Sequence, residues 1–85
     1  MQRSRDAGGD ASRPLSTARR GDRVVVVSFD GAPPHERHKL MALGILPGSL
    51  LSVLQRHPAF VIAAGYTQFA LDRETAASIL VRSAE

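Results

Sequence analysis

The sequence contains no cysteine and no tryptophan, and its single tyrosine is Tyr66. Without cysteine the chain has no disulfide, no thiolate metal ligand and no cysteine nucleophile. It has no apolar run near the ~18–20 residues that cross a bilayer. No apolar segment follows the charged N-terminus, as one would in a secretory signal. We therefore expect a cytoplasmic protein that is not inserted in a membrane.

Recognisable catalytic patterns are also missing from the sequence. The glycines at 8–9 and 44–48 lack the lysine and the strand–loop–helix frame of a phosphate-binding loop. Ser16, Ser28 and Ser49 have no nearby base in a recognisable arrangement. The carboxylates are few and scattered. These observations predict a protein that is not an enzyme.

The positive charge lies mainly at the N-terminal end of the sequence. Residues 1–20 hold five arginines against two aspartates, whereas residues 21–85 hold six basic and six acidic residues. Residues 1–14 show no apolar periodicity, so we expect a disordered basic leader there. It is either a solvated tail or a docking arm for an acidic partner. With a neutral folded part and few aromatic side chains, nucleic acid is not an expected partner.

The stretch Lys39–Gly48 carries the strongest structural signals. Leu40 and Leu43 lie three residues apart, so they share a helix face that we expect to close one end of the fold. Gly44 suits the left-handed exit of a helix. Pro47-Gly48 suits the two central positions of a type II turn. The stretch therefore predicts a helix end, a short link, a turn and a strand start.

Five short strands are predicted around this helix. Four consecutive valines open the set, which indicates burial on both faces or one face covered by another element. A helix of ~8–10 residues begins at Pro33-Pro34. A single helical turn capped by Asp72 precedes the last strand. The expected strands cover residues 22–29, 49–55, 60–64, 67–71 and 78–82. This order predicts a mainly β protein, a small closed or partly open barrel.

One pair of histidines has a metal-like spacing. His35 and His38 lie three residues apart at the start of the predicted helix, so both can reach one ion. His57 would add a third nitrogen only if the fold brings it close. Because a tight site has three or four protein ligands, the pair predicts at most weak binding of Fe²⁺ or Zn²⁺. An exposed polar helix start is the alternative.

Two motifs resemble the FeoA family, the small cytosolic component of bacterial ferrous iron transport. The first is Arg37–Gly48, a basic helix ending in leucines and a Leu-Gly-apolar-x-Pro-Gly corner. The second is Gly65-Tyr66 followed by Phe69-Ala70-Leu71, Ala76-Ala77 and the strand 79–81. The resemblance extends over residues 15–82 and leaves 83–85 as a tail. It departs from the family pattern after Pro58, where the hairpin is shorter.

The resemblance implies an SH3-like β-barrel that binds the cytoplasmic region of the permease FeoB, which carries a GTPase domain. It would lie at the inner membrane only through that partner, and a homo-oligomer is left open. The residues that we expect to contact the partner are Glu36, Arg37, Lys39, Ile45 and Leu46. The residues that we expect to be structural are Leu40, Leu43, Gly44, Pro47, Gly48, Gly65 and Leu71. Ile45 and Leu46 have the alternative of sealing the base of the barrel.

A second function follows from the same resemblance. An SH3-like barrel of this kind also forms the C-terminal domain of DtxR-type iron-dependent repressors. The alternative to an interaction module is therefore a domain that binds or senses a transition metal, with His35 and His38 as its candidate ligands.

Overall fold

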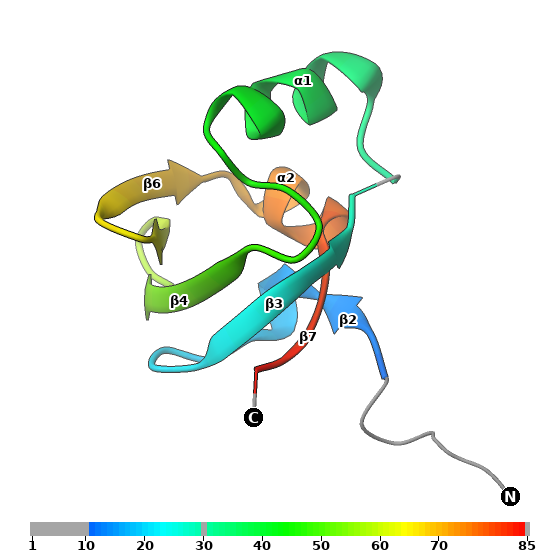
Figure 1. Cartoon of the computed structure of the whole chain (residues 1–85). Coiled ribbons are helices and arrows are strands. Elements are labelled where there is room, and N and C mark those ends of the chain that lie inside the picture. The colour runs from blue at the N-terminus through cyan, green and yellow to red at the C-terminus, as the bar shows by residue number, and fades with distance from the viewer. Residues whose placement is uncertain (1–10, 30, 85) are drawn as a thin grey trace, which may run out of the picture.

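Six antiparallel strands form one sheet in the computed structural model, which describes residues 11–29 and 31–84 (Figure 1). The order across the sheet is β2-β7-β3-β4-β5-β6. The bounds are β2 Arg13–Pro14, β3 Arg23–Ser28, β4 Leu50–Gln55, β5 Phe60–Ala64, β6 Thr67–Leu71 and β7 Leu80–Ser83. The mainly β prediction is confirmed, with six strands in place of five. Within the described residues no ladder joins the edge strands β2 and β6, so strand pairing does not close a barrel.

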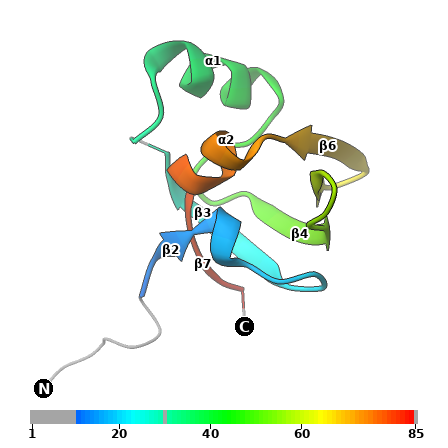
Figure 2. The same cartoon turned by 180° about the vertical axis from the view of Figure 1, so that it is seen from behind.

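The helical elements are short. They are the 3₁₀ helix η2 (Leu15–Thr17), α1 (Pro34–Ala42) and α2 (Arg73–Ser78). The predicted start of α1 at Pro34 is confirmed, and α2 is longer than the single predicted turn. The predicted cap of α2 is also confirmed, because Asp72 accepts a hydrogen bond of 2.7 Å from the Thr75 backbone N–H. In both views α2 lies between α1 and the strands β2 and β7 (Figures 1 and 2).

One face of the sheet forms the core. In β3, Val24 and Val26 are buried, whereas Val25 is half-buried and Val27 is exposed. The four valines therefore alternate, as side chains on a strand must, and only one face is covered. The other strands follow the same rule. The buried set that meets these valines includes Leu51, Val53, Phe60, Ile62, Ile79 and Val81.

The segment before β3 belongs to the fold, which corrects the expected leader. Arg13 and Pro14 pair with Val81 and Leu80 of β7. Leu15 is completely buried, and its N–H donates a 2.7 Å hydrogen bond to the Ile79 carbonyl. A strand of two residues shows no periodicity, so the sequence pattern did not indicate it. Its pairing partner, β7, lies at the far end of the chain. The rest of the expected leader, residues 1–10, lies outside the described residues.

The C-terminal boundary also shifts. Ser83 is the last residue of β7 rather than the first of a tail, and the Ala84 N–H donates to the Arg23 carbonyl at 3.0 Å. The strand begins at Leu80 because Ser78 and Ile79 end α2.

Candidate functional site

The C-terminal end of α1 is a Schellman motif centred on Gly44. Gly44 adopts a positive φ of 86°, and its N–H donates to the Met41 carbonyl at 2.9 Å. The Ile45 N–H reaches back to the Leu40 carbonyl at 2.9 Å. This pair of hydrogen bonds satisfies carbonyls that the helix end would leave open, and it folds the residue after glycine back onto the helix.

A type II turn follows and ties the helix to the sheet. The Ser49 N–H donates to the Leu46 carbonyl at 2.8 Å, and Gly48 has a φ of 94°. The Gly48 N–H donates to the Val26 carbonyl at 2.8 Å, and the Val26 N–H to the Ser49 carbonyl at 2.9 Å. The predicted roles of Gly44, Pro47 and Gly48 in this corner are thereby confirmed.

The side chains of the corner divide differently from the prediction. Leu40 is 1% exposed and Ile45 is 0% exposed, so both are core residues. Ile45 therefore offers no surface to a partner, and its expected contact role is wrong. Leu43 was expected in the core but is 37% exposed. The cause is the Schellman motif, which pairs Leu40 with Ile45 across the helix end and leaves Leu43 on the outer side.

Three aliphatic side chains remain exposed at this helix end. They are Met41, Leu43 and Leu46, of which Leu46 is 46% exposed. Met41 and Arg37 border one groove beside Phe29. Lys39 is exposed, so two basic residues accompany these apolar side chains. We call Arg37, Lys39, Met41, Leu43 and Leu46 the corner surface.

A second groove separates α1 from β6. The residues that line it include Leu43, Phe69, Leu71 and Lys39. Leu71 packs partly buried against the core, in keeping with its predicted structural role. β6 ends the sheet, so its outer edge has no strand partner among the described residues. An unpaired strand edge beside a groove can receive an extended segment of another chain.

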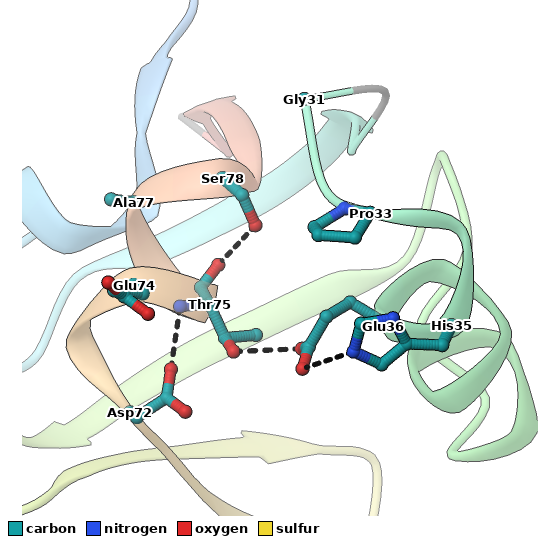
Figure 3. Close-up of a pocket in the computed structure, with 9 residues that line it drawn as sticks. All are labelled: Gly31, Pro33, His35, Glu36, Asp72, Glu74, Thr75, Ala77 and Ser78. Carbon is teal, nitrogen blue, oxygen red and sulfur yellow. Dashed lines mark hydrogen bonds and ion pairs between the residues drawn. The ribbon is translucent and has the colours of Figure 1, made fainter.

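Glu36 joins the two helices. Its Oε1 accepts a 2.9 Å hydrogen bond from the Thr75 hydroxyl of α2, across the groove drawn in Figure 3. The side chain is 25% exposed. Thr75, through hydrogen bonds from its side chain and its backbone N–H, also lowers the pKa of Asp72. The positive charge of Lys39 lowers that pKa further. Glu36 therefore stabilises the position of α1 and offers only a small area to a partner.

The histidines do not converge. Among the described residues, no group of three or more His, Asp or Glu side chains is placed to hold a metal ion. His35 lies 3.7 Å from Glu36 (Nε2 to Oε2), and its side chain is 81% exposed. His38 is exposed too. His57 instead accepts a 3.1 Å hydrogen bond at Nδ1 from the Arg73 guanidinium.

Gly65 fits its predicted structural role. It has a φ of 63° in the turn between β5 and β6, where a side chain would be disfavoured. Tyr66 follows it, fully exposed at the tip of the hairpin. The exposure of Met41 and Leu43 was not predicted from the sequence. For Leu43 the sequence does contain an indication, because a Schellman motif that pairs Leu40 with Ile45 leaves Leu43 on the outer side.

Comparison with known proteins agrees with this geometry. The family model of the FeoA domain matches residues 13–83. The crystal structure of an iron uptake regulatory protein (FeoA) superimposes with a TM-score of 0.75 at 32% identity, over 85% of this chain and 96% of that chain. No match was found among curated proteins.

Two further structures share the fold. A manganese-dependent transcriptional repressor matches with a TM-score of 0.77 at 28% identity, over 85% of this chain but only 41% of the repressor. FeoA of Stenotrophomonas maltophilia, described as a prokaryotic SH3 domain protein and complexed with zinc, gives 0.70 at 23% identity, over 79% and 86% of the two chains. The SH3-like architecture is therefore shared. From the match over residues 13–83, this chain belongs to the FeoA family.

Proposed function

We propose that this chain is a cytoplasmic accessory protein of ferrous iron uptake, without enzymatic activity, that binds the cytoplasmic region of a FeoB-type permease. Its family membership supports the iron-uptake role. Within the part of the chain that the structure describes, no helix has the length and hydrophobicity that crossing a bilayer requires.

The exposed aliphatic side chains of the corner surface carry the proposal. Met41, Leu43 and Leu46 lie within six residues of one another at the end of a helix that itself buries only Leu40. Exposed apolar side chains at one helix end, with basic residues on the same helix, suit a protein–protein contact. Arg37 and Lys39 provide the charged rim, which selects a partner surface with carboxylates.

A charge at Leu46 should weaken the interaction. We expect Leu46→Asp to weaken binding to the purified FeoB cytoplasmic region by about tenfold or more, because burying an unpaired carboxylate in an apolar contact is unfavourable. Leu46 is 46% exposed, so the fold should persist. Isothermal titration calorimetry measures the affinity.

Leu54→Asp is the matched control for this substitution. Leu54 is 40% exposed, close to the 46% of Leu46, but it belongs to β4 and not to the corner surface. It should bind as the unmodified protein does. Equal affinities of the unmodified, Leu46→Asp and Leu54→Asp proteins would remove Leu46 from the interface.

Weak metal binding is the second candidate function, and the proximity of His35 and Glu36 favours it. The pair would hold Zn²⁺ or Fe²⁺ through one nitrogen and one oxygen, with His38 one helical turn away. In a zinc titration followed by calorimetry, we expect His35→Ala/His38→Ala to lose the heat of binding. His57→Ala should keep it, because Arg73 already occupies that ring nitrogen. Unchanged binding by the double variant would dispose of the site.

A further inference from the structure

Five of the ten arginines of this chain belong to segments at the end of the molecule opposite α1. Figures 1 and 2 place the turn between η2 and β3, the start of β2 and the end of β7 at that end. Arg13, Arg19 and Arg23 border one shallow pocket there, beside Asp22 and Ser83. The arginines that these segments carry are Arg13, Arg19, Arg20, Arg23 and Arg82. The charge that the sequence places before residue 21 therefore belongs partly to the folded domain, which corrects the picture of a neutral fold with a basic leader.

One carboxylate accompanies these arginines among the described residues, and it is already engaged. Asp22 lies 3.5 Å from the Arg13 guanidinium and accepts a 2.9 Å hydrogen bond from the Arg19 backbone N–H. No ion pair is formed by Arg19, Arg23 or Arg82 with any other described residue. Glu85 follows in the sequence but lies outside the described residues. This end of the domain therefore presents a net positive charge to the solvent.

Two of these arginines, Arg23 and Arg82, lie beside apolar side chains on the face of the sheet that does not form the core. In the ladders, Val25 lies opposite Leu50 on one side and Arg82 on the other, so the three form one row. Arg23 lies two residues before Val25 on the same face. Beyond the row lie Val27 and Leu80. The exposed fractions of Val27, Leu50 and Leu80 are 38%, 43% and 37%. We call this set, with Arg19 and Arg20 of the adjacent turn, the arginine face.

We propose that the arginine face binds directly to membranes that contain anionic phospholipids. Guanidinium groups pair with lipid phosphates in bidentate geometry, and exposed aliphatic side chains beside them enter the apolar part of the interface. A nucleic acid would leave Val27, Leu50 and Leu80 without a role, and the face has no aromatic side chain for base stacking. The inference does not depend on the iron-uptake role, because the arginine face shares no residue with the corner surface.

Vesicle binding tests the proposal with the full chain. Vesicles of phosphatidylglycerol and phosphatidylcholine in equal parts should bind the protein in a sedimentation assay, whereas pure phosphatidylcholine should not. Added salt should weaken binding, because the attraction is electrostatic. Arg23→Ser/Arg82→Ser should lower the partition coefficient by about fivefold for each arginine removed. Arg19→Ser/Arg20→Ser, in the exposed turn, should act similarly and provides a second test if the strand variant unfolds.

Two controls remove the same charge elsewhere. Lys39→Ser/Arg73→Ser lies outside the arginine face, and Arg3→Ser/Arg5→Ser lies in the N-terminal segment. Both should bind nearly as the unmodified protein does. The proposal is overturned if the protein does not bind anionic vesicles, or if it binds both vesicle types equally. It is also overturned if Arg3→Ser/Arg5→Ser abolishes binding while the arginine-face variants retain it. Retention of duplex DNA but not of vesicles would assign the face to a nucleic acid.

Discussion

Replacing Ile45 with alanine is expected to lower the free energy of unfolding by about 2–5 kcal/mol. The side chain is 0% exposed, so its loss removes buried apolar surface and leaves a cavity beside Leu40. The stability of a domain of this size is only about 4–13 kcal/mol. Urea denaturation should therefore show a much lower midpoint with an unchanged slope. If Ile45 were a surface contact, the same substitution would leave the midpoint in place.

Leu46→Ala provides the comparison for Ile45. The two residues are adjacent, but Leu46 is 46% exposed, so its truncation should change stability by only about 0.5 kcal/mol or less. The binding assay should give the opposite order. Leu46→Ala should weaken binding directly, whereas Ile45→Ala should weaken it only by unfolding the protein. Similar stability losses for both variants would contradict the division of the corner into a buried and an exposed residue.

Leu15→Ala is expected to destabilise the domain by a similar amount, about 2–5 kcal/mol. Leu15 is completely buried in the core cluster, and its backbone N–H is bonded to Ile79. The substitution would therefore weaken the contact between the start of the fold and its last strand. Thermal unfolding followed by circular dichroism should show it clearly, since each kcal/mol lowers Tm by about 4–8 °C in a domain of this size.

Leu50→Ala is the control for the second prediction, because it makes the same chemical change at a leucine that is 43% exposed. Its Tm should stay within a few degrees of that of the unmodified protein, by the same size relation. A loss at Leu50 as large as that at Leu15 would mean that the outer face of the sheet is covered. That result would also count against the arginine face as an accessible surface.

Local chemistry made several elements predictable. Pro34 at the start of α1, Asp72 at the cap of α2 and the glycines at 44 and 48 each act through their own backbone preferences or nearest neighbours. The four valines identified a strand for the same reason, because β-branched side chains favour extended backbone wherever they occur. These features required no knowledge of what packs against them.

The exposure of individual side chains was not predictable in the same way. Leu43 was expected in the core but is exposed, and of the two alternatives for Ile45 the buried one holds, since the helix face that meets the core depends on where the sheet lies. Arg13 and Pro14 appeared structureless because their pairing partner, β7, is encoded far away in the sequence. The prediction of a neutral fold was wrong for the same reason. It assigned charges by their position in the sequence, whereas a partner is attracted by charges that lie close together in space.

The amino-acid sequence by itself determined five of the six strands in their order, the helix, the glycine and proline corner and, through two motifs, the family. The strands, the helix and the corner depend on backbone preferences that act over a few residues. Only the tertiary structure decided that Ile45 is buried while Leu46 is exposed, that Glu36 bonds Thr75, and that arginines from three segments line one pocket. Burial and proximity depend on contacts between residues distant in sequence, and no local preference contains that information.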